Sequence, residues 1–432
     1  MRSPLRRILV YTHTHRDRDC WPIASALRDL GHSVYYALHD QPTPAQLARL
    51  CHEAAFDLVL TSDRLLRSDI DDRYFLELSY RPRIYELIFN GLLEICEYYG
   101  RRDVDRRLEQ QNAALLVMDA GLQSTLRAIG IERASYLRYC IPERTILDPA
   151  YYATRAGLRQ YGWISPREHS AVRSAAEHAL ARVELRRRGL FARPKTFDVL
   201  FLGECAYGFD AKQIHDLSVT YLDAFDESAL LAVCHAFERD FPALVELDIA
   251  AAFAARDRLT RPLSLGQPGL ALFEDYLIVQ FRRYRRLQML RSLAAQLGPR
   301  LVLFGDQLAQ LGLPARKTDH RHTDRHYLRA KIAIDFGSNI YDSTLYTRPA
   351  QIIASHACLL QLAQPDCDLV LGRDREATTF ATRAELFDRV DAGLADDAGR
   401  DELMHAQRRL AFTTADWHRE LTRTLLAGFD DD

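Results

Sequence analysis

Short apolar runs rich in β-branched residues alternate along the chain with longer amphipathic stretches. Several runs are apolar at consecutive positions, which is typical of strands buried on both faces of a parallel sheet. The predicted strands are Arg7–Thr12, Ser33–Leu38, Phe56–Thr61, Ala113–Asp119, Phe197–Gly203, Leu301–Gly305, Lys331–Phe336, Ala357–Leu362 and Asp368–Leu371. Helical patterns lie between them, such as Trp21–Leu30, which Gly31 follows where a C-terminal cap is expected. This alternation predicts an α/β protein with doubly wound parallel sheets.

The number of predicted strands is large for a single sheet, so we expect two Rossmann-like domains that face each other across a cleft. A charged helical pattern ends at Gly189, and Arg193-Pro194-Lys195 then precedes a new buried strand. We therefore assign residues 1–190 to an N-terminal domain, 191–400 to a C-terminal domain and 401–432 to a helical tail. Residues 214–297 are helical in pattern, interrupted at Pro242 and around 262–269, and predict a helical insertion in the second domain.

Composition narrows the class of protein. The chain has 432 residues, of which 48% are hydrophobic, so it can bury two cores and is not a disordered protein. Its formal net charge of −2 gives no general attraction to nucleic acid. No run approaches the ~20 apolar residues of a membrane span, and the first apolar run, Ile8–Tyr11, is too short for a signal peptide. The 8 cysteines are scattered without a C-x-x-C pair. We expect buried thiols and a cytoplasmic location.

A candidate anion site follows one of the predicted strands. The strand ends at Phe336, a polar loop with Asn339 follows, and a helix is expected to begin near Pro349. Proline suits the first turn of a helix, and the free amides and dipole of that turn attract anions. Thr347 offers a hydroxyl group, and Arg348 offers a planar fork that matches a phosphate. The pattern predicts a diphosphate site, and it is also compatible with a capped surface helix that carries a solvated arginine.

Two further loops are expected at the same edge of this sheet. Gly203 and Gly208 lie in the loop after one strand, where the absence of a side chain lets the backbone approach a ligand closely. Gly305 ends another strand, which can border a nucleotide base or ribose. An ordinary strand-to-helix turn explains these glycines equally well.

These motifs, in their order along the chain, resemble those of the CgeB-like glycosyltransferases (spore maturation protein type), a group with the GT-B fold. The resemblance covers residues 113–425 and rests on Leu115–Asp119, Leu126–Gly130, Cys140–Pro142, Phe197–Gly203, Leu303–Gly305, Asn339, Arg348–Gln351 and Ala354–Leu360. It implies a nucleotide-sugar donor held by the C-terminal domain, an acceptor held by the N-terminal domain, and no required metal or other cofactor. It assigns donor binding to Gly203, Gly305, Asn339, Thr347, Arg348 and Gln351.

The chain departs from the family pattern at one donor position. In the family, a glutamate three residues after the arginine contacts the ribose or the sugar of the donor, and here Gln351 stands in its place. Glutamine keeps one acceptor and gains donors but loses the charge, so the change either retunes the activity or abolishes it. The His-Thr pair of the family is also replaced, by Phe412-Thr413-Thr414. As an exposed arginine, Arg348 is expected to contribute to donor binding and little to stability.

Candidate catalytic groups lie in the N-terminal domain. An inverting enzyme needs a base near the acceptor hydroxyl, and His13, His15 and Asp17 directly follow the first strand. Asp119 ends another strand at the same edge. A retaining enzyme can dispense with this base and rely on stabilisation of the leaving phosphate. The two histidines also fit a reading as ordinary loop residues.

Other motifs favour simpler interpretations. Residues 319–326 carry metal-ligand types without helical or cysteine spacing, so we interpret them as a polar loop. The run Arg282–Arg286 suits either a polyanionic acceptor or, in our preferred interpretation, the solvated face of a helix. The acceptor is open among a glycan, a protein, a small molecule and nucleic acid, and so is the oligomeric state. Alternative functions are a nucleotide-sugar epimerase or hydrolase and an inactive binding protein with the same fold.

Overall fold

The computed structural model divides into two compact units, which are described separately. Unit 1 contains Met1–Phe191 and Phe412–Asp432, and unit 2 contains Ala192–Ala411. No helix among the described residues is long and apolar enough to cross a membrane. The structure describes residues 6–12, 17–38, 44–62, 82–88, 108–109, 112–118, 120–128, 130–137, 162–164, 195–205, 207–209, 211–212, 214–215, 227–247, 251–252, 268–317, 326–337, 347–364, 367, 371, 375–414, 421 and 424–425.

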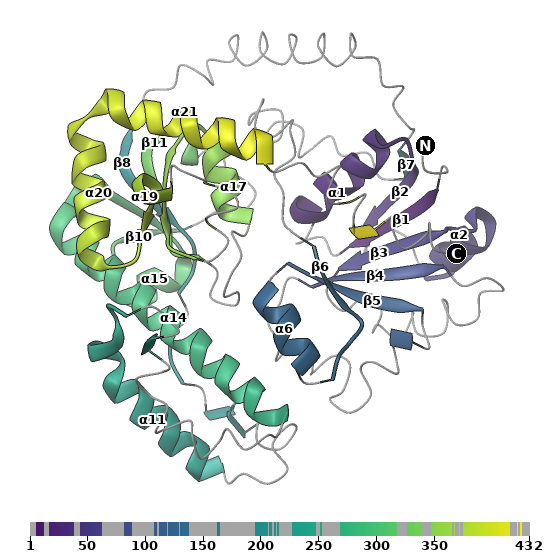
Figure 1. Ribbon diagram of the computed structural model, residues 1–432, viewed down its shortest axis with the longest axis horizontal. Coiled ribbons are helices and arrows are strands. Elements are labelled where there is room, and N and C mark those ends of the chain that lie inside the picture. The colour runs from purple at the N-terminus through teal and green to yellow at the C-terminus, as the bar shows by residue number, and fades with distance from the viewer. Residues whose placement is uncertain are drawn as a thin grey trace. The chain divides into compact units, whose positions relative to one another are not determined.

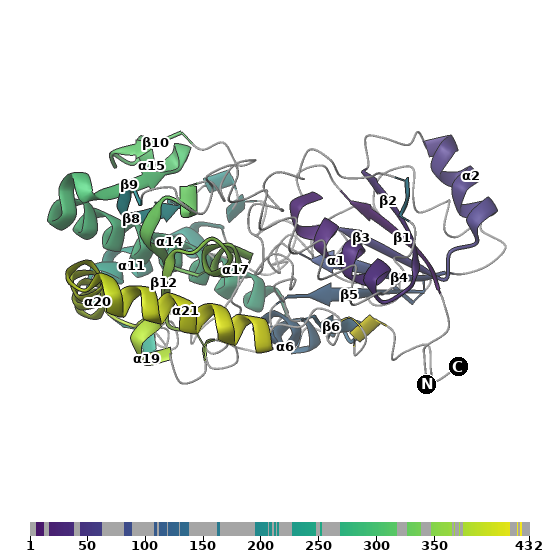
Figure 2. The ribbon, with the colours of Figure 1, turned by 90° about the horizontal axis from the view of Figure 1, so that it is seen from above.

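Unit 1 is built on a seven-stranded sheet in the order β6-β5-β4-β3-β1-β2-β7. All neighbouring strands are parallel except β2 and β7, which are antiparallel. Helix α1 packs on β1 and β2, as Figure 2 shows, and α6 packs on β5 and β6. The elements are β1 (Arg7–Thr12), α1 (Asp17–Asp29), β2 (Ser33–Leu38), α2 (Pro44–Ala54), β3 (Leu58–Ser62), β4 (Arg83–Ile88), β5 (Ala113–Val117), α6 (Ala120–Ala128), β6 (Ala134–Tyr136) and β7 (Gly162–Ile164).

The direction of strand addition in unit 1 reverses between β1 and β3, where β1 lies between the second and third strands of the chain. At their carboxyl ends the Thr12 and Ser62 hydroxyl groups form a buried hydrogen bond of 2.6 Å, and Thr12 Oγ1 also donates to Cys20 Sγ at 3.2 Å. The second bond ties the end of β1 to the first turn of α1. In doubly wound sheets, ligands bind at such reversal points.

Unit 2 is built on a six-stranded parallel sheet in the order β10-β9-β8-β11-β12-β13. Counted from its own first strand, β8, this is the order 3-2-1-4-5-6 of a dinucleotide-binding Rossmann sheet. The strands are β8 (Phe197–Leu202), β9 (Leu301–Phe304), β10 (Ala315–Arg316), β11 (Ala330–Asp335), β12 (Cys358–Leu362) and β13 (Thr379–Phe380). The helices are α11 (Glu227–Leu244), α14 (Pro268–Leu297), α15 (Asp306–Gln310), α17 (Thr347–Ala354), α19 (Arg375–Thr378), α20 (Arg383–Ala395) and α21 (Asp397–Thr414), with a 3-10 turn at Gly298–Arg300.

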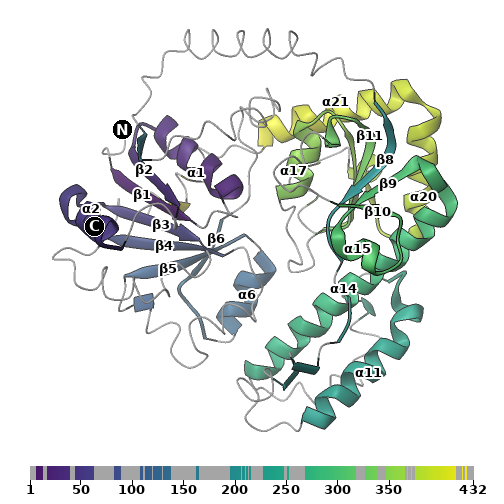
Figure 3. The ribbon, with the colours of Figure 1, turned by 180° about the vertical axis from the view of Figure 1, so that it is seen from behind.

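The helical insertion of unit 2 is confirmed by α11 and α14, which lie side by side (Figures 1 and 3). Phe237 and Phe241 of α11 pack against Phe281 of α14, with ring centroids 6.2 and 5.2 Å apart. The predicted interruption at Pro242 is wrong, because α11 continues through this residue to Leu244. Only one backbone N–H is lost to the proline, and it falls in the last turn of the helix.

The predicted fold class is confirmed by these two doubly wound α/β sheets. Each predicted strand through Ala357–Leu362 appears within one or two residues of its predicted ends. Of the predicted strand Asp368–Leu371, only Leu371 is described, and it is helical. The six described cysteines are buried and unbridged, as expected: Cys20, Cys51, Cys205, Cys234, Cys358 and Cys367.

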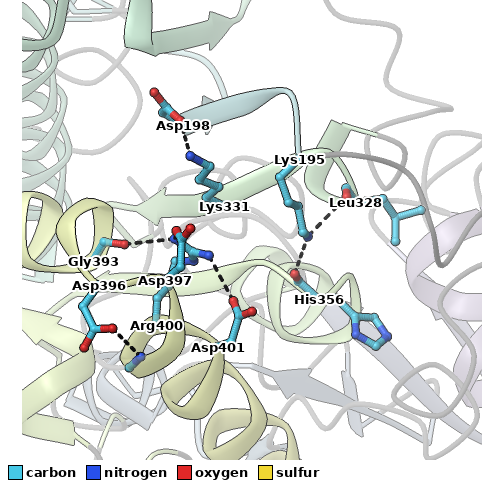
Figure 4. A network of polar contacts seen from close by, with 11 residues as sticks. Lys195, Asp198, Leu328, Lys331, His356, Gly393, Asp396, Asp397, Arg400 and Asp401 are labelled. Atoms are coloured by element: carbon cyan, nitrogen blue, oxygen red, sulfur yellow. Dashed lines mark hydrogen bonds and ion pairs between the residues drawn. The ribbon is translucent and has the colours of Figure 1, made fainter.

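A polar network lies at the amino-terminal edge of the unit 2 sheet, opposite the strand ends at which ligands bind (Figure 4). Lys195 Nζ donates hydrogen bonds to the backbone carbonyls of Leu328 and His356. Burial lowers the pKa of Lys195 to about 8. His356 Nε2 is hydrogen-bonded to Arg408, and burial, reinforced by the positive charges of Arg408 and Lys195, lowers the pKa of His356 to about 3. The network therefore keeps the His356 ring neutral in the folded protein.

His356 is expected to make the stability of unit 2 sensitive to acid. Its pKa rises to the ordinary 6.5 on unfolding, so below pH 6.5 the unfolded chain binds more protons than the folded chain. The free energy of unfolding therefore decreases as the pH is lowered. The contribution is on the order of 3 kcal/mol between pH 7 and pH 4. Urea unfolding between pH 7 and pH 4 should show a smaller loss of unfolding free energy for His356→Asn than for the wild type, because asparagine does not titrate. Asparagine also tolerates the positive φ of 56° at this position. The control for the substitution itself is His235→Asn, at an exposed position of α11 outside this network.

Candidate functional site: the reversal point of the second sheet

The carboxyl ends of β8 and β11 meet at the point where strand addition in unit 2 reverses. These two strands are hydrogen-bonded neighbours, with Phe201 opposite Ile334 in the register. The loop after β8 begins at Gly203, and β11 ends at Asp335, so the two loops leave the sheet side by side. The chain continues from β8 to β9 on one side and from β11 to β12 on the other, so strand addition reverses between them. In this class of fold, ligands bind beyond the strand ends at such a point.

Arg348 forms an ion pair at this point. It lies in the first turn of α17, and its Nη1 donates to Asp335 Oδ1 at 2.8 Å. The Asp335 side chain is 2% exposed and that of Arg348 is 25% exposed. Asp335 Oδ2 accepts a second hydrogen bond, of 2.9 Å, from the backbone N–H of Gly337. The expectation of an exposed arginine with little structural role is therefore wrong, because Arg348 neutralises a buried carboxylate.

Gly203 and Gly305 allow three chain segments to converge beside this ion pair. A Cβ atom on Gly203 would lie 3.1 Å from Arg348 Nη2 and 3.1 Å from the Phe201 ring, so glycine leaves room for the guanidinium. A Cβ atom on Gly305 would lie 2.2 Å from the backbone carbonyl oxygen of Gly203. No side chain can be accommodated at that distance. The ends of β8 and β9 can approach this closely only because residue 305 is glycine.

Glu204, in the loop after β8, occupies another possible anion site, the amino-terminal end of α15. Both carboxylate oxygens of Glu204 accept hydrogen bonds of 2.8 Å, from the backbone N–H groups of Asp306 and Gln307. These are the first amides of α15, so Glu204 already satisfies them. The candidate anion site is therefore the start of α17, beside the end of β11.

Arg286 of α14 supplies a second cation next to Arg348. It is 3% exposed and donates from Nη1 to the carbonyl oxygen of Glu204 at 2.9 Å and from Nη2 to that of Gly337. Burial, reinforced by the positive charge of Arg348, lowers the pKa of Arg286 to about 10. The interpretation of Arg282–Arg286 as a solvated helical face is wrong for this residue and for Arg285, which is 4% exposed. At the ordinary pH of a cell, Arg286 remains a buried cation.

The arrangement suits an anion. Arg286 and Arg348 both lie near the Phe201 ring, with guanidinium carbons 6.0 and 5.9 Å from its centroid. The carboxylate of Asp335 interacts with both guanidinium groups. It forms the ion pair with Arg348, and its negative charge raises the pKa of Arg286. Two guanidinium groups with one intervening carboxylate leave an excess of positive charge, and a phosphate group would neutralise it through charge-assisted hydrogen bonds.

The predicted donor-binding residues fall partly within this arrangement. Gly203, Gly305 and Arg348 are brought together as described above. Gln351 lies one turn further along α17 and is half-buried. Thr347 is the first residue of α17, but its side chain is not among those that the structure describes. Asn339 lies outside the described residues altogether, so its role stays a prediction.

The predicted catalytic residues of unit 1 also stay predictions. His13 and His15 follow Thr12, the last residue of β1, and both lie outside the described residues. Asp17 is the first residue of α1, but its side chain is not described. Asp119 lies outside the described residues, between Met118 and the start of α6. Within the described part of the chain, no group of three or more His, Cys, Asp or Glu side chains could hold a metal ion.

Similarity to known proteins is confined to solved structures. No protein-family model and no curated protein matches the sequence. One similar structure is T4 phage BGT in complex with UDP and Mn²⁺, with a TM-score of 0.47, 12% identity and coverage of 96% of this chain and 99% of that one. Another is Anabaena HepE in complex with UDP (TM-score 0.45, 10% identity, coverage 98% and 100%).

A third similar structure is sucrose-phosphate synthase from Thermosynechococcus elongatus, with a TM-score of 0.45, 11% identity and coverage of 98% of this chain and 100% of that one. All three TM-scores lie below 0.5.

Three residues of the site were missed by sequence reasoning. Asp335 is an acid within an otherwise apolar strand, and this contrast was an available signal, because an acid in a buried strand needs a specific partner. Arg286 lies in an arginine-rich run, and arginine is usually exposed, so the sequence did not indicate its burial. Glu204 gave no signal, since its two partners lie 102 and 103 residues away in the chain.

Proposed function

We propose that the chain is a GT-B glycosyltransferase of the CgeB-like group, which transfers a sugar from a nucleoside-diphosphate sugar to an acceptor. The observation that carries the proposal is the position of Arg348. It lies in the first turn of a helix, beside Gly203, at the reversal point of a sheet with the 3-2-1-4-5-6 order. Helix amides and a guanidinium at such a point favour a diphosphate.

In this proposal, unit 2 holds the donor and the chain's own residues supply the stabilisation of the leaving group. Arg348 and the first amides of α17 bind the diphosphate, and Gln351 binds hydroxyl groups of the ribose or the sugar. As the glycosidic bond breaks, negative charge grows on the diphosphate, and the fixed cations stabilise it more than they stabilise the intact donor. Unit 1 holds the acceptor, and His13, Asp17 and Asp119 are the proposed groups for accepting its proton. No metal or other cofactor is required, and the location is the cytoplasm.

The test of the proposal is a panel of UDP-, GDP- and dTDP-sugars. A donor present at 100 times its Kd should raise the free energy of unfolding by about 2.7 kcal/mol. Mass spectrometry of the mixture, with and without candidate acceptors, then identifies the reaction. Conversion of the donor without an acceptor would indicate an epimerase or a hydrolase instead. A panel in which no sugar nucleotide changes the stability contradicts the proposal.

Gln351→Ala should weaken donor binding about five- to tenfold, because one or two hydrogen bonds to hydroxyl groups are lost. Its unfolding free energy should stay close to the wild-type value, since Gln351 is only half-buried on a surface helix. Isothermal titration with the tightest donor of the panel measures the change. Gln351→Glu separates the two interpretations of the natural glutamine: if it creates turnover in a chain that has none, the protein is an inactive binding protein.

A further inference from the structure

The helical insertion of unit 2 is fastened to both loops of the reversal point by one buried side chain. Arg286 lies on α14, between β8 and β9 in the chain, and it belongs to neither loop. Its guanidinium donates to the Glu204 carbonyl in the loop after β8 and to the Gly337 carbonyl in the loop after β11. Beyond the paired ends of β8 and β11, this side chain therefore joins two loops that are far apart in the sequence.

The loop after β8 is held to α14 at two more points. Cys205 Sγ donates to the carbonyl of Arg283 at 3.0 Å, and the backbone N–H of Gly208 donates to Gln280 Oε1 at 3.3 Å. Tyr207, in the same loop, forms a hydrogen bond with Glu238 of α11. The loop is therefore held along a short stretch of α14, from Gln280 to Arg286, and by one residue of α11. By contrast, Arg286 alone among these contacts also reaches the loop after β11.

Arg286 also shares an aromatic partner with Arg348. Both guanidinium groups lie about the same distance from the Phe201 ring, and Arg348 Nη2 is near the position that a Cβ on Gly203 would occupy. A displacement of Arg286 would therefore change the positions of both loops and the electrostatic surroundings of Arg348. Two of its N–H groups donate to the two carbonyl oxygens, and its Nε is buried without a hydrogen-bond partner among the described residues.

We infer that Arg286 is a positioning residue for the diphosphate of the donor, acting by fixing the Glu204 and Gly337 loops at the separation that the diphosphate needs. This inference rests on the proposed function, since it assigns the donor to the same site. Arg286 acts through the loops and through Arg348. The helical insertion is thereby part of the donor site, although its residues lie outside the strand–loop–helix motifs of the sheet.

The neighbouring residue provides a matched control. Arg285 lies on the same helix and is as buried as Arg286, but it donates to the carbonyl of Ala381, which belongs to neither loop. Arg285→Met and Arg286→Met each remove a buried guanidinium and its hydrogen bonds while keeping an unbranched apolar stem. Both variants are expected to unfold at lower urea concentrations than the wild type. A purely structural role predicts the same ligand affinity for the two.

The experiment measures the Kd for UDP, GDP, ADP and dTDP by isothermal titration of the full chain, at a temperature where all variants are folded. For the tightest of the four, Arg286→Met should weaken binding at least tenfold, and Arg285→Met should change it by less than twofold. Arg286→Lys, which can reach one of the two carbonyl oxygens, should recover part of the affinity. With the matching sugar nucleotide, Arg286→Met should raise the donor KM more than it lowers kcat.

The outcomes separate the inference from the function on which it rests. If the wild type binds one of the nucleotides and Arg286→Met binds it as tightly as Arg285→Met does, the inference is overturned and the proposed function stands. If the wild type binds none of the four, both are overturned. Hydrogen exchange gives an independent readout without ligand. The amides of Gly203 and Gly337 should exchange faster in Arg286→Met than in Arg285→Met, and equal rates would contradict the positioning role.

Discussion

Arg348→Ala is expected to lose donor affinity by a factor of about 10 to 100 and to destabilise unit 2 at the same time. The affinity falls because charge-assisted hydrogen bonds to a phosphate contribute about 1.5–3 kcal/mol. The stability falls because Asp335 remains buried without its ion-pair partner. We expect a cost of about 2–3 kcal/mol, below the usual range for a broken buried pair, since Asp335 keeps the Gly337 N–H. Isothermal titration and urea unfolding measure the two effects.

The double variant Arg348→Ala/Asp335→Asn separates these effects. It removes the buried charge together with its partner, so it should regain much of the lost stability. It cannot regain donor affinity, because the guanidinium that binds the phosphate is still absent. A double variant that recovers both stability and affinity would show that Arg348 acts only through the fold, and the proposed diphosphate contact would be wrong.

Gly305→Ala is expected to be the most destabilising single methyl addition in the sheet of unit 2. The new Cβ would lie 2.2 Å from the carbonyl oxygen of Gly203, so the ends of β8 and β9 must separate. The backbone at residue 305 also has a φ of 159°, at the limit of the region that favours glycine. Strain and overpacking together cost roughly 4 kcal/mol. Since Gly203 moves, donor affinity should fall as well, and urea unfolding with titration measures both.

Gly312→Ala is the control for the conformational part of this effect. Gly312 has a φ of 81°, and a Cβ there meets no atom within 4 Å. The strain of a left-handed alanine remains, at about 1 kcal/mol, and the clash is absent. Donor affinity should be unchanged. If the two variants lose equal stability, the close approach at Gly305 does not hold the strand ends together as described.

The strands of the core were predictable because their apolar runs are continuous. Residues on both faces of a buried parallel strand contact apolar neighbours, so Ile8–Val10 and Leu58–Leu60 carry the signal on their own. β4 was missed because Arg83 and Glu86 break its run, although Glu86 is fully buried. The short edge strands, such as β7 with its three residues, are defined by pairing with a neighbour and not by a pattern of their own.

The candidate site was predictable only as far as it depends on local sequence. The start of α17 follows from Thr347-Arg348-Pro349, and its position beyond a strand follows from the alternation of elements. The partners of Arg348 and Arg286 depend on which strands lie side by side, and this order cannot be predicted from a single sequence. The strand order put Asp335 beside the loop of Gly203, and the 30-residue helix α14 placed Arg286 between them.

The central claim is that a nucleoside diphosphate binds at the reversal point of the unit 2 sheet. Hydrogen exchange read by mass spectrometry, with and without a saturating nucleoside diphosphate, tests this most directly. We predict slower exchange on binding in three segments, residues 203–209, 335–337 and 347–351, with the amides of α15 unchanged because Glu204 already holds them. Slower exchange confined to unit 1, or a bound nucleotide that leaves these three segments unaltered, would contradict it.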